Sequence, residues 1–142
     1  MSSQRNEEMD ARVPLRVLFA EDDPDMVELV RIAVQGEPDF ELVATTSEAS
    51  AVLDLVREHD PDVVILDHRL SDPHSRDAPG VGHAPTGLEL VDGARRAAPK
   101  ATIVIFSGQH GLRTAAQNVG ADAYIEKPAL DGLWSAIREV RA

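Results

Sequence analysis

Four short apolar runs in this chain each end in a polar residue, and this feature limits the folds that the sequence can adopt. The runs are Val17–Ala20, Val63–Leu66, Thr102–Phe106 and Ala123–Glu126. Near-continuous apolar runs are typical of parallel strands whose two faces are covered by helices. The polar residues that follow are Glu21 and Asp22, Asp67, Ser107 and Lys127. Because parallel strands end at one edge of a sheet, we expect these side chains to share a pocket.

The segments between the runs have helical patterns, so strands and helices alternate along the chain. We expect one more strand over 40–45 and helices over 24–35, 48–59, 87–97, 112–119 and 129–141. Five strands alternating with five helices predict an α/β fold: a doubly wound, five-stranded parallel sheet of the flavodoxin-like kind.

Local signals predict where these helices begin and which faces they bury. Asp23 is placed to cap the first helix, with Pro24 at its first position, and Ser47 is placed to cap the second. The apolar face of the first helix is expected to hold Met26, Val27, Leu29, Val30, Ala33 and Val34. The inner face of the last helix is expected to hold Leu130, Leu133, Ile137 and Val140.

Length, charge and cysteine content exclude several classes of protein. The 142 residues suffice for one domain, and the net charge of −11 argues against nonspecific binding to DNA or to an anionic membrane. No apolar stretch is long enough to cross a bilayer, and the absence of cysteine excludes disulfides and thiolate metal sites. Residues 1–12 can bury too little apolar surface to become ordered, so we expect a disordered tail before a domain over 13–142. A cytoplasmic location is the default expectation.

The acidic residues at two of the strand ends suit phosphoryl chemistry. The Asp67 carboxylate is a nucleophile that can form an acyl phosphate. A phosphoryl donor approaches it only when a cation neutralises the phosphoryl oxygens. Glu21 and Asp22 would supply carboxylate ligands for Mg²⁺ or Mn²⁺. The plainer interpretations are a turn-capping aspartate and an exposed acidic run.

The other two strand ends carry groups that can bind a phosphoryl oxygen. Lys127 is a point charge on a flexible stem that can pair with Asp67 or with the phosphoryl group. Pro128 behind it is compatible with a cis peptide bond that would aim the lysine inward. Ser107 offers a hydroxyl donor. An ordinary surface lysine and a turn serine are the plainer interpretations of these two residues.

Together these motifs resemble the receiver domain of two-component response regulators from Arg16 to Ala142. The matching segments are Glu21-Asp22, Ile65-Leu66-Asp67, Phe106-Ser107-Gly108 and Gly120–Pro128. The resemblance implies that Asp67 accepts the phosphoryl group and that Glu21, Asp22, Asp67 and the Arg69 backbone carbonyl hold Mg²⁺. It implies that Ser107 and Lys127 bind the phosphoryl group. Tyr124 takes the place of the switch aromatic, the alternative being a half-buried strand tyrosine.

The function implied by the resemblance is that of a signalling switch rather than a turnover enzyme. A histidine kinase or a histidine phosphotransfer protein would donate the phosphoryl group, and a downstream protein effector would read the altered surface. The resemblance also allows a phosphorylation-linked homodimer, and we expect no direct contact with nucleic acid or membrane. Two alternatives remain: a phosphorylation-independent scaffold with this fold, and an aspartyl-nucleophile phosphatase. Such phosphatases commonly carry a second aspartate two residues after the nucleophile, where this chain has Arg69.

One departure from the family is an extended loop over 68–86, rich in proline and glycine. Loops of this length are usually functional or disordered, and we expect this one to be mobile and to carry no chemistry. Its histidines, His68, His74 and His83, are irregularly spaced, so solvent-exposed side chains are favoured over a metal site.

The second departure is the large cation Arg69, two residues after the expected phosphoacceptor. Its guanidinium could lie across the approach of the water that hydrolyses an acyl phosphate and pair with a phosphoryl oxygen. Gln109 lies on the same rim, just beyond Ser107. We therefore expect Arg69 and Gln109 to lengthen the lifetime of a phosphorylated Asp67.

Overall fold

The computed structural model describes residues 13–70 and 86–142, in which strands and helices alternate as expected. The strands are β1 (Leu15–Ala20), β2 (Phe40–Thr46), β3 (Val63–Leu66), β4 (Thr102–Ser107) and β5 (Ala123–Glu126). The helices are α2 (Pro24–Gln35), α3 (Ala49–His59), α5 (Gly87–Ala97), α6 (Arg113–Asn118) and α7 (Leu130–Arg141). The described strands pair in parallel in the order β2-β1-β3-β4-β5. The predicted fold class is confirmed.

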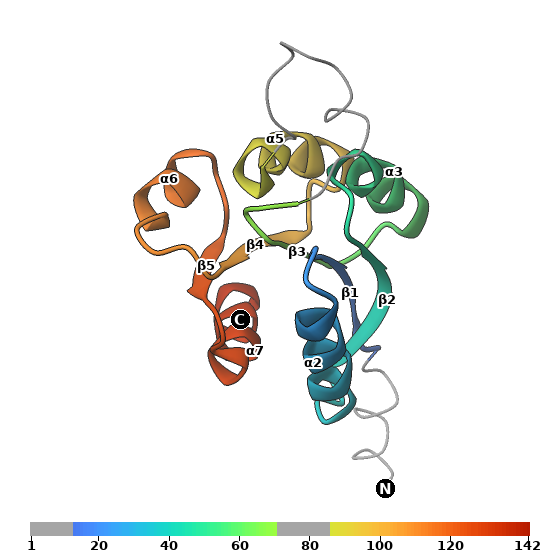
Figure 1. Cartoon of the computed structure of the whole chain (residues 1–142). Coiled ribbons are helices and arrows are strands. Elements are labelled where there is room, and N and C mark those ends of the chain that lie inside the picture. Colours follow the sequence, from blue (N-terminus) through green and yellow to red (C-terminus); the bar gives the residue numbers. More distant parts are fainter. Residues whose placement is uncertain (1–12, 71–85) are drawn as a thin grey trace, which may run out of the picture.

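Two apolar layers cover the two faces of this sheet. Helices α2 and α7 lie on one face, and α3, α5 and α6 lie on the other (Figure 1). Successive strand residues point to opposite faces, so Val17 and Phe19 pack toward α2 and α7, whereas Leu18 and Ala20 pack toward α3 and α5. This two-sided burial explains why β1, β3 and β4 are almost wholly apolar. No helix in 13–70 or 86–142 is long and apolar enough to span a membrane.

The helix starts agree with the sequence at α2 and differ at α3. The Asp23 side chain accepts a hydrogen bond from the Asp25 backbone N–H and Pro24 opens the helix, as predicted. The prediction that Ser47 caps α3 is wrong. The N-cap is Glu48, without a side-chain cap, and the Thr46 hydroxyl accepts from the Glu48 backbone N–H instead. The helix therefore begins one residue too late for Ser47 to reach its first turn.

Two residues assigned to inner helix faces are exposed. Leu29 is 48% exposed, because it lies about 100° around α2 from the buried Val30. Val140 is 43% exposed in the last turn of α7, and the buried face of that helix is instead completed by Trp134. The spacing of apolar residues thus located both helices correctly but assigned one exposed residue to the buried face of each.

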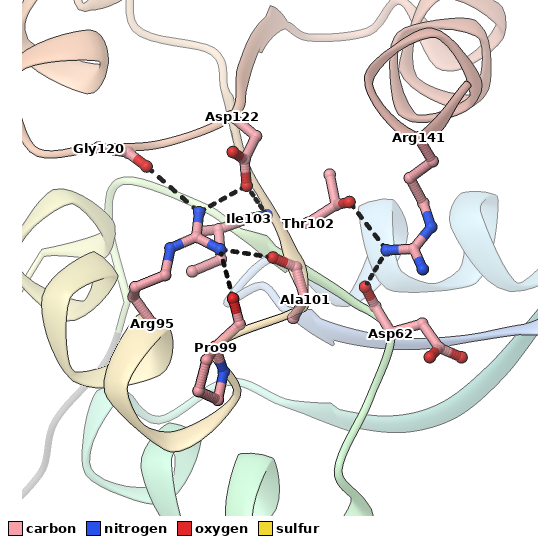
Figure 2. Close-up of polar contacts among 9 residues, drawn as sticks. All are labelled: Asp62, Arg95, Pro99, Ala101, Thr102, Ile103, Gly120, Asp122 and Arg141. Carbon is pink, nitrogen blue, oxygen red and sulfur yellow. Dashed lines mark hydrogen bonds and ion pairs between the residues drawn. The ribbon is translucent and has the colours of Figure 1, made fainter.

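The sheet edge opposite the expected pocket is held together by Arg95 of α5 (Figure 2). Its guanidinium lies 2.6 Å from an Asp122 carboxylate oxygen and donates to the Ala101 carbonyl at 2.7 Å. The same Asp122 oxygen accepts from the Ile103 backbone N–H at 2.8 Å, which ties the start of β5 to β4. Asp122 belongs to the motif over 120–128, and its contacts give it a structural role far from the polar strand ends.

Removing the Arg95 guanidinium should therefore loosen α5 and β5 from β4. We expect Arg95→Ala to lower the free energy of unfolding by about 1–2 kcal/mol, the scale of hydrogen bonds to charged groups that are partly exposed. Arg96→Ala is a matched control, because Arg96 forms an exposed pair with Asp92 whose loss should cost less than about 0.5 kcal/mol. Urea unfolding followed by tryptophan fluorescence measures both. Equal losses in the two variants would contradict the structural role of Arg95.

Candidate functional site

The polar residues that follow the central strands converge at the carboxyl edge of the sheet. The backbone ladder continues past the strand ends, because the Asp67 N–H donates to the Ala20 carbonyl at 2.9 Å and the Lys127 N–H donates to the Ser107 carbonyl at 2.8 Å. Asp67 is thereby fixed beside the end of β1, and Lys127 beside the end of β4. The predicted convergence is confirmed for the described backbone.

The Lys127 ammonium lies between two buried carboxylates. Its Nζ is 2.6 Å from Glu21 Oε1 and 3.2 Å from Asp67 Oδ2. The Glu21 side chain is 1% exposed and that of Asp67 10% exposed. The sequence offered Asp67 or a phosphoryl oxygen as the partner of Lys127; the structure shows the contact with Asp67 and a shorter one with Glu21. The Lys127–Pro128 peptide bond is cis.

The electrostatics of the pair indicate a place for a further cation. Burial, joined by the neighbouring Asp67 carboxylate, raises the pKa of Glu21 to about 7 despite the lowering effect of Lys127. One lysine therefore does not fully compensate two carboxylates held this close together. A divalent cation at the same edge would complete the compensation.

The residues present fit Mg²⁺ as an ion that takes few protein ligands. Asp22 follows Glu21 and is exposed at the rim of a hollow of about 520 Å³, which Glu21 also lines. In the described part of the chain, no three His, Asp or Glu side chains form a ready-made metal cage. Mg²⁺ usually takes one or two carboxylates and keeps several waters, so Asp67 and Asp22 with a backbone carbonyl are an adequate donor set.

The Ser107 hydroxyl and the Tyr124 hydroxyl meet at the same residue, Gln109. The Ser107 oxygen, 2% exposed as a residue, accepts from the Gln109 backbone N–H at 3.0 Å. The Tyr124 hydroxyl donates to the Gln109 carbonyl at 2.8 Å. Tyr124 is buried rather than half-buried, and the Arg113 guanidinium lies 5.2 Å from its ring centroid. Burial, assisted by the nearby Glu126 carboxylate, raises the pKa of the phenol.

The two residues after Asp67, His68 and Arg69, lie closer to the surface than the Asp67 carboxylate. Arg69 is exposed, two residues beyond Asp67. His68 is half-buried, and its Nδ1 has no hydrogen-bond partner among the described residues. Burial and the neighbouring Arg69 lower the pKa of His68. His74 and His83, with most of the 68–86 loop, lie outside the described residues.

Gly87 is a site residue that the sequence reasoning missed. It opens α5, and its backbone N–H donates to the His68 carbonyl at 2.8 Å. A Cβ on Gly87 would lie 2.2 Å from the Asp67 carbonyl oxygen, so only glycine allows this approach. The available signal was the capping box of Thr86 and Glu89, which starts the helix at this glycine.

Comparisons with known proteins agree with this geometry. A model of the response regulator receiver domain matches residues 17–138. The transcriptional regulatory protein PdtaR of Mycobacterium tuberculosis is 32% identical over 145 aligned positions, which cover 94% of this chain and 63% of PdtaR. A protein-glutamate methylesterase/protein-glutamine glutaminase of Pseudomonas aeruginosa is 28% identical, with 92% of this chain and 36% of that protein covered. The chain thus spans less than two thirds of the length of these relatives.

Solved structures show the same architecture. A two-component response regulator of the LuxR family from Aurantimonas superposes with a TM-score of 0.73 at 27% identity, covering 90% of this chain and 85% of that one. A CheY-like receiver domain protein from Methanospirillum hungatei gives a TM-score of 0.71 at 21% identity, covering 91% and 98%, which supports the fold alone. With the family match over 17–138, these findings show that the chain belongs to the response regulator receiver domain family of two-component systems.

Proposed function

We propose that this chain is a switch that accepts a phosphoryl group on Asp67 from a histidine kinase or a histidine phosphotransfer protein. The observation that carries this proposal is the Lys127 ammonium set between the buried Glu21 and Asp67 carboxylates at the sheet edge. Membership of the receiver family and the names of the relatives support the same function.

In the proposed reaction, an Asp67 carboxylate oxygen attacks the phosphorus of a phosphohistidine. A new P–O bond forms while the P–N bond breaks, and the electron pair leaves with the imidazole. Lys127 stabilises the negative charge on the transferred group, and Ser107 donates its hydroxyl proton to a phosphoryl oxygen. Mg²⁺ or Mn²⁺ would be held by Asp22, Glu21, Asp67 and the Arg69 carbonyl, and would neutralise charge on the phosphoryl oxygens.

The proposed output is a change in protein contacts. Ser107 and Tyr124 both contact the loop between β4 and α6, so recruitment of Ser107 by a phosphoryl group would restrain this loop and the surface around it in one arrangement. A protein effector or a second copy of the chain would read that surface. The net charge of −11 disfavours direct contact with nucleic acid, although PdtaR is named a transcriptional regulator.

One incubation separates this function from the alternatives. The chain is mixed with Mg²⁺ and acetyl phosphate, and intact mass and free phosphate are followed over time. A switch gains one phosphoryl group per chain with slow phosphate release. An aspartyl-nucleophile phosphatase would release phosphate in many turnovers, but it would need a general acid where this chain has Arg69. A phosphorylation-independent scaffold would gain no mass, an outcome that would overturn the proposal.

The exposed Asp22 should make the largest single contribution to cation binding. Glu21 is buried and already paired with Lys127, whereas the Asp22 side chain is exposed. We expect Asp22→Asn to weaken Mg²⁺ binding by at least about tenfold, since even outer-shell partners of metal ligands contribute 10- to 100-fold. Isothermal titration with Mg²⁺ measures the effect, with Asp25→Asn as a neighbouring charge control. Equal affinities of wild type and Asp22→Asn would remove Asp22 from the ligand set.

Arg69 and Gln109 are proposed to lengthen the lifetime of the phosphorylated state. Arg69 is exposed next to the nucleophile, so its guanidinium can pair with a phosphoryl oxygen and shield the acyl phosphate from water. We expect phospho-Asp67 to decay faster in Arg69→Ala than in wild type, measured as phosphate release after the donor is removed. Slower decay would mean that Arg69 assists hydrolysis, as an arginine finger does.

A further inference from the structure

A continuous set of polar contacts joins the Ser107 hydroxyl to the protein surface. Gln109 contributes both of its backbone groups: its N–H donates to Ser107 Oγ at 3.0 Å and its carbonyl accepts from the Tyr124 hydroxyl at 2.8 Å. The same hydroxyl lies 3.2 Å from Glu126 Oε2. The other oxygen of Glu126, Oε1, lies 3.2 Å from His110 Nδ1, and the His110 side chain is 82% exposed.

The Tyr124 hydroxyl thus has two acceptors and only one proton. A phenol donates a single hydrogen bond, so the Gln109 carbonyl and the Glu126 carboxylate compete for it. An ionised carboxylate is a stronger acceptor than a neutral carbonyl, although the shorter distance favours Gln109 in this structure. His110 pairs with the far oxygen of Glu126, which reduces the demand of that carboxylate for the phenol proton.

We propose that Glu126 and His110 are positioning residues for the phosphoryl site. Glu126 weakens the hydrogen bond between Tyr124 and the Gln109 carbonyl, and His110 limits this effect by engaging Glu126. The proposal rests on the proposed function of Asp67 and Ser107.

The link to the phosphoryl site runs through the Gln109 peptide groups. Because Ser107 Oγ accepts a hydrogen bond from the Gln109 N–H, its own proton is available for a phosphoryl oxygen. A hydroxyl that accepts one hydrogen bond also donates a stronger hydrogen bond. A firm bond from Tyr124 to the Gln109 carbonyl holds this loop in place. A substitution that strengthens the hydrogen bond from Tyr124 to the Gln109 carbonyl should therefore raise the affinity for a phosphoryl group at Asp67. By linkage, binding of the phosphoryl group should strengthen the same hydrogen bond.

A purely structural role for the His110–Glu126 pair predicts something different. An exposed ion pair contributes little to stability, so its removal would leave both unfolding and ligand affinity nearly unchanged. Arg113 lies over the face of the Tyr124 ring, and its charge lowers the pKa of the phenol, opposite to the effect of Glu126. The proposed effect is therefore expected in the affinity of the site rather than in the stability of the chain.

Beryllofluoride with Mg²⁺, a mimic of the phosphoryl group, provides the affinity test by isothermal titration on the full chain. Glu126→Gln should bind it about 2- to 10-fold more tightly, because the amide can donate to the phenol oxygen instead of competing for its proton. His110→Ala should bind it more weakly and should have no effect in the Glu126→Gln background. Neither change should matter in Tyr124→Phe, and Glu139→Gln on α7 is the charge-matched control. Effects that persist in Tyr124→Phe would overturn the proposal.

The only tyrosine of the chain gives a second measurement that is independent of phosphoryl binding. Ultraviolet titration of the phenol should show a lower Tyr124 pKa in Glu126→Gln than in wild type, because the removed carboxylate disfavours the phenolate. An unchanged Tyr124 pKa would show that Glu126 does not contact the hydroxyl and would overturn this inference alone. Failure of the wild type to bind beryllofluoride, with the pKa difference present, would instead overturn the proposed function of Asp67.

Discussion

Replacing Asp67 by asparagine should abolish phosphorylation of the chain by acetyl phosphate. The variant keeps the shape of the side chain and removes the ionised oxygen that attacks phosphorus, so no acyl phosphate can form there. It also removes a carboxylate from the expected cation site, so beryllofluoride binding should fall below detection. Intact mass after incubation with Mg²⁺ and acetyl phosphate measures the loss. In the wild type, the added group should be released by hydroxylamine, which attacks acyl phosphates.

The loss in Asp67→Asn should not come from unfolding. The variant gives up the 3.2 Å contact with Lys127 but relieves the repulsion between Asp67 and the buried Glu21, and Lys127 keeps its 2.6 Å contact with Glu21. These effects oppose each other, so the free energy of unfolding should remain close to that of wild type. Trp134, a buried residue of α7, reports the fold by its fluorescence. Asp54→Asn on the exposed face of α3 is the control, and undiminished labelling of Asp67→Asn would place the phosphoacceptor elsewhere.

The convergence of the site was predictable because it depends on the backbone. Parallel pairing of β1, β3 and β4 brings their carboxyl ends together whatever side chains they carry, so the end of each apolar run identified Glu21, Asp67 and Ser107. The partner of Lys127 was less predictable. Its shorter contact is with Glu21, and that choice depends on rotamers and burial that spacing along the chain does not contain.

Features that depend on contacts between distant segments could not be predicted in the same way. Asp122 belongs to a recognisable motif, yet its partner Arg95 lies on a separate helix and no local pattern connects the two. The hydrogen bonds that relate Tyr124 to Ser107 pass through the backbone of Gln109, whose residue type is irrelevant to them. Leu29 shows the converse, because an apolar residue beside a buried stripe has the same spacing pattern as one within it.

Gly87 is the clearest case of a residue whose role depends on a distant segment of the chain. Replacing it by alanine should damage both the fold and the site. The new Cβ would lie 2.2 Å from the Asp67 carbonyl oxygen and 2.9 Å from its carbonyl carbon, distances that no side-chain rotation can relieve. Either the start of α5 or the backbone of Asp67 must move. We expect Gly87→Ala to lower the free energy of unfolding by about 1–3 kcal/mol, the usual cost of overpacking a well-packed interior.

The displacement in Gly87→Ala should also slow phosphorylation, because an error of about 1 Å in the position of a reacting group can cost 100-fold in rate. Gly132→Ala on α7 is the matched control: its Cβ would meet Ala129 at an ordinary 3.6 Å, and alanine favours a helix by about 0.5–1 kcal/mol over glycine. Urea unfolding should show a loss of stability in Gly87→Ala and a gain in Gly132→Ala, and only Gly87→Ala should be labelled more slowly by acetyl phosphate. Wild-type labelling in a folded Gly87→Ala chain would mean that Asp67 tolerates the shift and that α5 yields instead.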